Sequence, residues 1–289
     1  MNVLVSTDSS CLTSNDVFSG YDISVFPLNV IIDGEEFLDG VTINQETLEK
    51  EMRAGKSIKT STPPLGSVIE YFEKLFEKGY DHVIHFTISS KLSSMYDLFC
   101  NVAKQHFDGK VTVIDSYALS SVMLSYVFYA FDAVKEGVLP EKIKEVVESQ
   151  KENSDVFFIP ENLTALKNGG RISPAAALIG NIIGIKPIIV LKDGALEKEG
   201  TTKKMRKEFV ERATLLKEKF STDGYDYSVM HFGVSPEKMQ QMFEALNTVL
   251  PDCKIVDAII PINCCAHCGP GTVGLLVSPK MNGKSLNEF

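Results

Sequence analysis

The sequence contains no long uninterrupted hydrophobic run. Its longest apolar stretch, Tyr117 to Phe131, is broken by Ser120, Ser121 and Ser125, and it is shorter than the roughly 20 residues that a membrane-spanning helix requires. Met1 to Val5 lack the basic segment that begins a secretory signal peptide. These absences predict a cytoplasmic protein without a transmembrane segment, in which the six cysteines are reduced.

Positive charge is also scarce. The 289 residues include 29 Lys and Arg against 38 Asp and Glu, which gives a formal net charge of −9. Nucleic-acid binding needs a concentrated basic face. The densest basic stretch, residues 203–207, is of the kind found more often on a solvated helix face. The charge balance therefore argues against nucleic acid as the main partner.

Several motifs for catalysis or cofactor binding are missing. There is no Walker-type Gly-x-x-x-x-Gly-Lys-Ser/Thr loop, no dinucleotide-binding Gly-x-Gly-x-x-Gly after a strand and no Gly-x-Ser-x-Gly nucleophile elbow. Cys264, Cys265 and Cys268 stand beside His267, but a zinc site needs four ligands, usually in two spaced pairs. The other cysteines are scattered singly. We therefore expect neither a metal nor a cofactor.

Short β-branched runs alternate with a helical pattern in the first half of the chain. Apolar residues recur at helical spacing from Val68 to Phe76, and Gly79 follows as a stop signal. Such alternation predicts a mainly parallel sheet covered by helices on both faces. The strands of this sheet are expected at Val3–Val5, Ile23–Phe26, Val83–Phe86 and Val111–Ile114.

The second half alternates in a different way. Lys192 to Ala195 has the sequence of a tight hairpin turn, which predicts a mixed sheet. Strands are expected at Val156–Ile159, Ile185–Leu191, Tyr227–Phe232, Ile255–Ile260 and Val273–Val277, and helices at Ala175–Ile183, Lys203–Phe220 and Pro236–Leu250. The chain is long enough for two domains, and the charged helix Glu141–Glu152 ends near Asn153. We predict an α/β fold of two domains, 1–153 with three layers and a mainly parallel sheet and 154–289 with a mixed sheet.

Two hydroxyl-rich segments are candidates for binding an anion. Thr60-Ser61-Thr62 precedes Pro63-Pro64, which would place Thr62 near the N-cap of the next helix. Ser89-Ser90 and Ser93 follow a buried strand, and ligands of open α/β sheets bind beyond the carboxyl ends of strands. Plain helix capping would explain the first segment alone, but two such segments are more than capping requires. Backbone N–H groups and the helix dipole favour an anion there.

Two further segments carry side chains suited to the same anion. Arg171 follows Gly169-Gly170 and precedes a helix expected to begin near Pro174. His267 stands at the entrance of a rigid Gly-Pro-Gly loop that leads into a strand. A Ser93, His267 and Asp8 nucleophilic triad, in a serine-dependent acyl hydrolase or transferase, is the alternative, although no oxyanion hole can be identified for it.

Together these segments resemble the DegV family of bacterial lipid-binding proteins. The resemblance extends almost from end to end and rests on Thr7-Asp8-Ser9-Ser10, Thr60-Ser61-Thr62-Pro63, Ser89-Ser90-Lys91-Leu92-Ser93, Asp115-Ser116, Gly169-Gly170-Arg171-Ile172, Ile185-Lys186-Pro187-Ile188, Asp193-Gly194 and His267-Cys268-Gly269-Pro270-Gly271. Each segment alone is a weak signal. Their common order and spacing make the resemblance specific.

The resemblance implies a non-catalytic protein that buries one long-chain fatty acid between its two domains. It also implies that a separate ATP-dependent fatty acid kinase phosphorylates the carboxylate. By position, the hydroxyls that bind the carboxylate are those of Ser61 and Ser93, with Thr62, Arg171 and His267 close by.

This chain departs from the family pattern at two places. Ser94-Met95 stands where the family often has Gly-Thr, so the bulky Met95 could reshape the pocket near the head group. Gly200 and Thr202 stand where the family often has arginines. If that region docks the kinase, its docking charge is reduced here.

Overall fold

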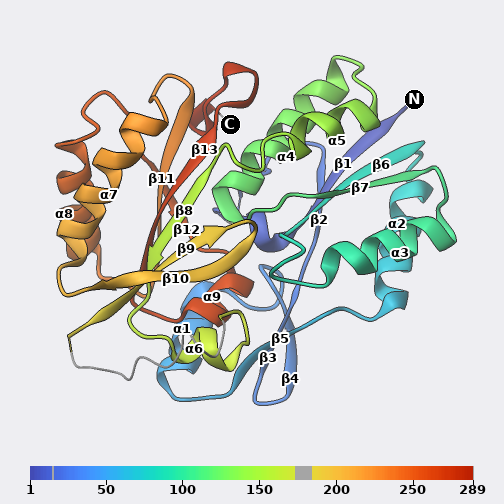
Figure 1. The fold of residues 1–289 in the computed structure, drawn as a ribbon. Helices are drawn as coiled ribbons and strands as arrows, with labels where there is room; N and C mark the ends of the chain where they lie inside the picture. The colour runs from blue at the N-terminus through green and yellow to red at the C-terminus, as the bar shows by residue number, and fades with distance from the viewer. Residues whose placement is uncertain (15, 173–183, 289) are drawn as a thin grey trace.

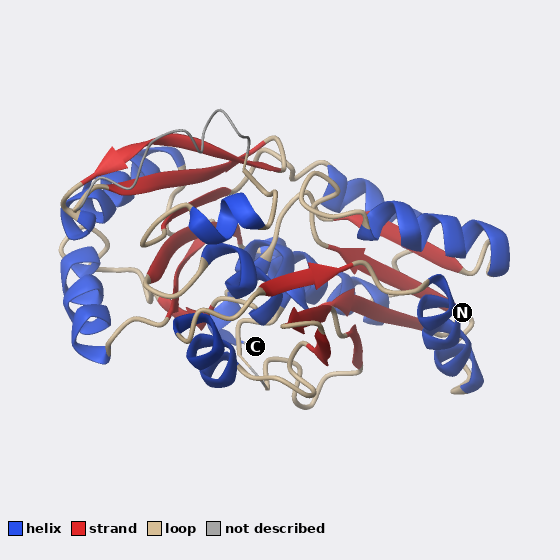
Figure 2. Ribbon diagram, turned by 90° about the horizontal axis from the view of Figure 1, so that it is seen from below, coloured by secondary structure: helices blue, strands red, loops and turns tan. Residues whose placement is uncertain are grey.

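The computed structural model describes residues 1–14, 16–172 and 184–288. It shows an α/β fold in which two sheets lie on either side of a central helical layer (Figure 1). The helix expected at Ala175–Ile183, and its start near Pro174, lie outside the described residues. Figure 2 shows helices at both outer ends of the molecule and strands between them. No helix within the described ranges has the length and apolar content needed to cross a membrane.

The first sheet is parallel, as predicted. Its strands lie in the order β2 (Ile23–Phe26), β1 (Val3–Asp8), β6 (His82–Thr87) and β7 (Val111–Asp115). Helices α2 (Leu65–Glu77) and α3 (Met95–His106) cover one face, and α4 (Ser120–Lys135) and α5 (Pro140–Glu148) cover the other. Side chains alternate along a strand, so Leu4 and Val83 pack with α2 and α3 while Val5 and Ile84 pack with α4.

A small antiparallel sheet, which the sequence did not lead us to expect, lies beside the first. It contains β4 (Glu35–Leu38), β3 (Asn29–Ile32) and β5 (Ile58–Ser61), and α1 (Gln45–Arg53) lies between β4 and β5 in the chain. The β3–β4 turn has positive φ at Asp33 (49°) and Gly34 (92°), as a tight hairpin of the Asp-Gly type requires. This sheet brings the end of β5 beside the loops of the first sheet.

The second sheet is mixed, as predicted. Its order is β10 (Ala195–Thr202), β9 (Lys186–Lys192), β8 (Asp155–Ile159), β13 (Thr272–Pro279), β11 (Tyr225–Phe232) and β12 (Val256–Ile259), and only the last pair is parallel among the described strands. The predicted hairpin turn joins β9 to β10, with positive φ at Asp193 (50°) and Gly194 (77°). Helices α7 (Met205–Lys219) and α8 (Pro236–Asn247) cover the outer face.

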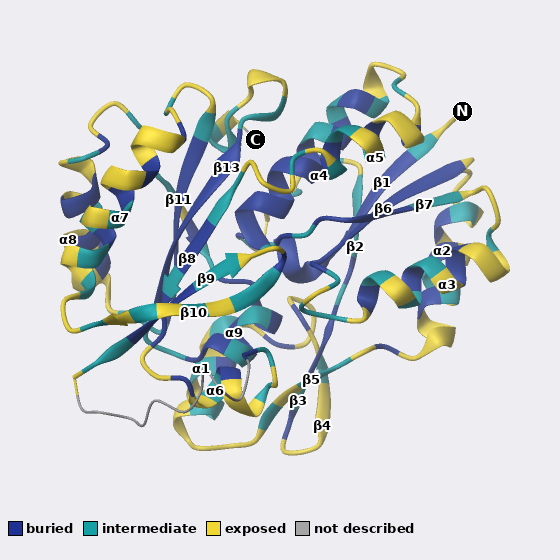
Figure 3. Ribbon diagram, viewed as in Figure 1, coloured by how far each residue is buried: buried dark blue, intermediate teal, exposed yellow. Residues whose placement is uncertain are grey.

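Helix α4 belongs to the cores of both halves of the molecule. It packs against β1 of the first sheet and β13 of the second, and most of its residues are buried (Figure 3). A helix that is apolar on nearly all sides is one that is surrounded by protein, which explains why Tyr117 to Phe131 contain no charged residue. The fold class is confirmed, while the domain boundary near Asn153 stays a prediction.

The remaining described elements are short. Two small helices, α6 (Thr164–Asn168) and α9 (Ile262–Cys268), pack against each other, and α9 also contacts β5 and α1. Three 3-10 helices lie at Ser9–Cys11, Met281–Gly283 and Leu286–Glu288. The α6–α9 pair, β5 and the loop after β6 surround the site described next.

Candidate ligand-binding site

A cavity lies between the first-sheet loops, β5 and the inner face of the second sheet. It contains about 990 Å³ of space free of protein atoms, part of it open to solvent. Both halves of the chain line it. All five side chains predicted to bind the carboxylate lie on its wall: Ser61, Thr62, Ser93, Arg171 and His267. Their role as carboxylate ligands stays a prediction.

These five side chains belong to one connected cluster. At one side of it, the Thr60 Oγ1 atom lies 2.9 Å from His267 Nε2. Gly169 packs directly on the imidazole, since a Cβ atom on Gly169 would lie only 2.1 Å from His267 Nδ1. Arg171 donates from a terminal guanidinium nitrogen to the carbonyl of Gly169 at 2.5 Å. The end of β5, α9 and the segment after α6 are thereby joined.

The cluster continues through the loop after β6. Arg171 Nε donates to the carbonyl oxygen of Leu92 at 3.2 Å, which places the guanidinium beside Ser93. The Oγ1 atom of Thr62 lies 2.9 Å from Ser94 Oγ, and both residues are exposed. The contacts therefore close into a ring, which we call the polar ring, and its solvent-facing side is at Thr62 and Ser94. Its members are Thr60, Ser61, Thr62, Ser93, Ser94, Arg171 and His267.

Two hydroxyls of the polar ring are available to a ligand. Thr60 and Thr62 have partners in His267 and Ser94. The hydroxyls of Ser61 and Ser93, by contrast, have no hydrogen-bond partner among the residues that the structure describes, and both line the cavity. Ser61 and Ser93 can therefore donate to a bound group without breaking an existing bond.

The charge of the polar ring is set by Arg171 and by the state of His267. Burial, with the positive charge of Arg171 nearby, lowers the pKa of His267 to about 4, so the imidazole is neutral at pH 7. Its Nδ1 atom is buried and has no partner within the described part of the chain. Arg171 is the one cation among the described lining residues, and no carboxylate lines the cavity with it. Such a cavity can take one negative charge.

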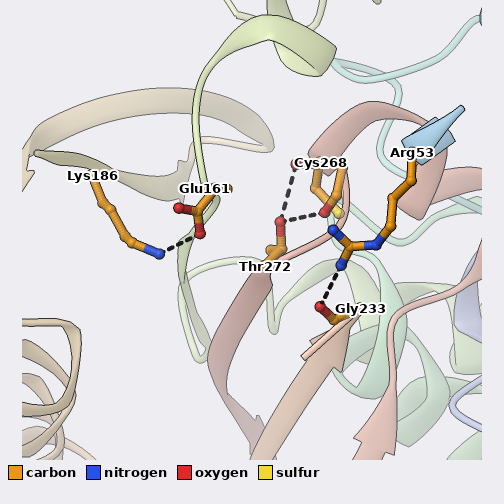
Figure 4. Close-up of polar contacts among 7 residues, drawn as sticks. Arg53, Glu161, Lys186, Gly233, Cys268 and Thr272 are labelled. Atoms are coloured by element: carbon orange, nitrogen blue, oxygen red, sulfur yellow. Dashed lines mark hydrogen bonds and ion pairs between the residues drawn. The ribbon is translucent and has the colours of Figure 1, made fainter. Parts of the chain in front are cut away.

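The position of α9, which carries His267, is fixed at both of its ends. At the start, the buried carboxylate of Asp39 accepts hydrogen bonds from the backbone N–H (3.1 Å) and side-chain amide (2.7 Å) of Asn263. At the end, the Thr272 hydroxyl lies 3.0 Å from the carbonyl oxygen of Cys268 and 2.7 Å from that of Gly269 (Figure 4). The helix therefore holds the imidazole firmly against Thr60.

Sequence reasoning missed three polar residues of the cavity wall, Asn29, Ser120 and Asn263, and one of the supporting residues. Asn29 and Asn263 line the cavity, and Asp39 supports Asn263 from behind. Isolated asparagines carry no motif, and α9 itself was not predicted, so no sequence signal pointed to them. Asn29 is paired with Ser61 across the small sheet, a relation that only the unexpected β3–β5 pairing creates.

The structure corrects the expected setting of Thr62. Helix α2 begins at Leu65 with Pro64 as its N-cap, and no side chain caps it. Thr62 therefore lies near the N-cap, two residues before it, but it does not cap the helix, and the two prolines precede the first turn. Thr60 and Ser61 belong to β5, in the antiparallel sheet, and not to a loop beyond the parallel sheet. The residues still reach the cavity because β5 ends beside the loop after β6.

Ser89, which we expected to help bind the anion, forms a structural hydrogen bond instead. Its buried hydroxyl donates to the carbonyl oxygen of Gly194 at 2.7 Å, at the tip of the β9–β10 hairpin. It does not line the cavity with Ser93. Ser89 thus joins the first half of the chain to the second sheet.

The rest of the wall is mainly apolar. Val156 and Phe158 of β8, Met230 of β11 and Leu276 of β13 face the cavity, because they occupy alternate positions on the face of the sheet opposite α7 and α8. Leucine and isoleucine side chains from the first half complete the wall: Leu28, Ile88, Leu92 and Leu119, with Ile260 from the second half. The cavity therefore suits a long apolar group with one polar end.

The alternative catalytic triad is not assembled. No hydrogen bond joins Ser93 to His267 in the described chain, and His267 Nε2 is bonded to Thr60. The carboxylate of Asp8 instead accepts from the backbone N–H groups of Ser10 (2.9 Å) and Ile88 (2.8 Å). Within the same residues, no three His, Cys, Asp or Glu side chains converge as a metal site.

The fold and the cavity define an α/β protein with a mainly apolar pocket and a polar side that faces solvent. Comparison with known proteins supports the fold class. The model of the DegV family, described as uncharacterised proteins, matches residues 2–280. A DegV domain-containing protein of Staphylococcus aureus is 30% identical over 285 residues, which cover 96% of this chain and 99% of that protein. The chain belongs to the DegV family.

Several solved structures resemble nearly the whole chain. A DegV family protein from Thermus thermophilus, reported for its fatty acid binding, is 26% identical with a TM-score of 0.85 and coverage of 96% of this chain and 100% of its own. A stearic acid-binding protein from Eubacterium ventriosum is also 26% identical, with a TM-score of 0.84 and coverage of 96% and 98%.

Proposed function

We propose that this protein binds one long-chain fatty acid, without catalysis of its own, and presents the carboxylate to a separate ATP-dependent kinase. The observation that carries the proposal is the composition of the cavity. One cation and no carboxylate line it among the described residues, most of the lining hydroxyls belong to the polar ring, and the remaining wall is mainly apolar. The reported fatty acid and stearic acid binding of the two similar solved structures supports the same ligand class.

In this proposal the fatty acid carboxylate lies inside the polar ring. The hydroxyls of Ser61 and Ser93 donate to it, because they are the members with no other partner in the described chain. Arg171 contributes its positive charge, and His267, neutral at pH 7, holds Thr60 in place. A hydrogen bond to a charged group contributes about 1.5–3 kcal/mol, so two hydroxyls and one guanidinium are sufficient to orient the acid.

The acyl chain then extends along the apolar wall of the second sheet. Each methylene removed from water contributes about 0.8 kcal/mol, so most of the affinity comes from the chain and the polar ring sets its direction. Thr62 and Ser94 are exposed, so the carboxylate end lies near solvent. This placement suits transfer of a phosphoryl group by a partner that brings its own ATP.

Lipid extraction tests ligand binding directly. Protein purified from cells is expected to release about one equivalent of fatty acid into organic solvent, identified by mass spectrometry. Ser61→Ala combined with Ser93→Ala should weaken retention by roughly 100-fold or more, from about 1.5–3 kcal/mol for each lost bond. Ser149→Ala is the matched control, since its exposed hydroxyl contacts only neighbouring residues far from the cavity, namely the carbonyl oxygen of Val146 and the side-chain amide of Gln150.

The outcomes separate the parts of the proposal. Wild-type protein without fatty acid would contradict the ligand class, and unchanged lipid content in the double variant would contradict the site. For the kinase step, acyl phosphate is expected only when lipid-loaded protein, ATP and a fatty acid kinase are mixed. Labelling of Ser93 by a serine-directed phosphonate would instead favour the hydrolase.

A further inference from the structure

Gly274 lies in the middle of β13, a central strand of the second sheet, on the cavity face. A glycine weakens a strand interior, since it adds backbone entropy and no packing. Positive φ is the usual reason to keep one, but Gly274 is not among the glycines with positive φ. We therefore attribute the glycine to the room that its missing side chain leaves in the cavity.

The neighbours of Gly274 show what that space is. Across the sheet it is paired with Phe158 on one side and Met230 on the other. A Cβ atom at position 274 would meet Phe158 Cβ at 3.2 Å and Leu276 Cδ1 at 3.3 Å. Val156, Phe158, Met230 and Leu276 all have substantial side chains on this face, so Gly274 is a notch in an otherwise filled wall.

The notch lies directly on the path from the polar ring to the deep end of the cavity. Thr272, the first cavity-facing residue of β13, is bonded to the end of α9 next to His267. Gly274 is two residues further, about 7 Å at the rise of a strand, and Leu276 lies about 7 Å beyond it. An acyl chain that runs from the polar ring toward Leu276 must pass Gly274.

The opposite wall is close at the same level. Leu119 and Ser120, at the start of α4, line the cavity. The Ser120 hydroxyl contacts the sulfur of Met230 at 2.6 Å, and Met230 is the residue paired with Gly274. The cavity is therefore bounded at this level by α4 on one side and by Gly274, with Phe158 and Leu276 beside it, on the other.

We infer that Gly274 determines how long an acyl chain the cavity accepts, because its missing side chain keeps the passage between α4 and β13 open. The inference rests on the proposed function. It adds that the part of the cavity beyond Gly274, toward Leu276 and Val156, is used only by long chains. Short chains that end before the notch do not depend on it.

The test compares two probes, dodecanoate and octadecanoate, on delipidated protein. Gly274→Val is expected to weaken octadecanoate binding by about fourfold for each methylene excluded from the cavity, hence by more than about tenfold, with much less effect on dodecanoate. Gly200→Val is the matched control, since Gly200 is a strand glycine of the same sheet where a Cβ would meet only Ile188 Cδ1, at 3.7 Å.

A second variant protects the test against misfolding. Gly274→Val combined with Leu276→Ala removes the Cδ1 atom that a side chain at position 274 would meet, and it should recover octadecanoate binding, which a misfolded chain could not. An unchanged ratio of the two affinities in folded Gly274→Val, or no recovery in the double variant, would overturn the inference. If the valine variant does not fold, the ratio of octadecanoate to dodecanoate affinity is measured for Gly274→Ala instead, with the same expected result. Wild-type protein that binds neither acid would overturn the proposed function and this inference together.

Discussion

Ser89 provides the sharpest test of how the two halves of the molecule are held around the cavity. Its buried hydroxyl donates to the carbonyl oxygen of Gly194 at 2.7 Å and accepts from the backbone N–H of Lys91 at 3.3 Å. The first bond connects the loop after β6 with the tip of the β9–β10 hairpin. Ser89→Ala removes both bonds and leaves the buried Gly194 carbonyl without this donor.

The expected loss follows from the burial of that carbonyl. A buried polar group left without its partner costs about 1–3 kcal/mol, so the free energy of unfolding should fall by that amount. In a protein of this size each kcal/mol corresponds to a decrease of about 2–4 °C in Tm. Urea unfolding followed by circular dichroism measures the change. Ser149→Ala, which removes an exposed hydroxyl, should stay within about 0.5 kcal/mol of the wild type.

The same substitution should change ligand exchange. Leu196 lies two residues beyond the hairpin tip and lines the cavity, so a hairpin released from Ser89 uncovers part of the wall. We expect Ser89→Ala to exchange a fluorescent fatty acid faster than the wild type and the Ser149→Ala control do. If Ser89→Ala lost no more stability than the control, or exchanged its ligand at the wild-type rate, the reasoning about the hairpin would be refuted.

Further predictions concern α9 and its surroundings. Gly169→Ala should weaken fatty acid retention, because the new Cβ would lie 2.1 Å from His267 Nδ1 and displace the imidazole from the polar ring. Lipid extraction measures the retention, and a value equal to that of the wild type would contradict this. Burial lowers the pKa of His267 to about 4, so between about pH 6.5 and 4 the unfolded chain binds a proton that the folded chain does not, and this residue's contribution to stability is lost on acidification. Urea unfolding at several pH values measures this loss. In His267→Gln, the decrease in the free energy of unfolding on acidification should be smaller than in the wild type by about 3 kcal/mol. Burial raises the pKa of Asp39 to about 6, so between about pH 4 and 6 the folded chain keeps a proton that the unfolded chain has lost, and stability falls as the pH rises. Asp39→Asn should therefore lose stability relative to the wild type mainly at low pH, and a difference independent of pH would contradict the burial argument.

Much of the fold could be predicted because most strands are long and β-branched. The strands β1, β2, β6 and β7 were expected near their observed positions, since each has an apolar run bounded by polar residues. The strands β4 and β5 were missed because each has at most two apolar residues among its four, whereas the equally short β2, which was predicted, has three. The strand β3 also has three apolar residues and was overlooked. The Asp33-Gly34 turn between β3 and β4 was the available signal, and it is the same signal that correctly predicted the β9–β10 hairpin.

The candidate site divides in a similar way. Ser61, Thr62, Ser93, Arg171 and His267 could be selected because they lie in short polar motifs and match a family pattern, and the structure places all five on one cavity wall. The sequence could not show which hydroxyls form hydrogen bonds within the protein. Thr60 and Ser89 carry the same group as their neighbours, but they serve His267 and Gly194 instead. Such pairings depend on contacts between residues more than 100 positions apart.

The shared core limits how a ligand can enter. Separation of the two halves as rigid bodies would expose Val156, Met230 and Leu276, which are at most 3% exposed and belong to the core cluster that contains α4. At about 1.5–3 kcal/mol for each buried side chain, these three alone would cost about 5–9 kcal/mol, which is comparable with the whole stability of a typical domain. Local release of the β9–β10 hairpin costs only the Ser89–Gly194 bond and nearby contacts. We therefore expect the opening at the polar ring to widen by release of the hairpin and not by separation of the halves, so that a cross-link between the hairpin tip and the loop after β6 slows exchange while the fold is unchanged. Equal exchange rates with and without the cross-link would contradict this route.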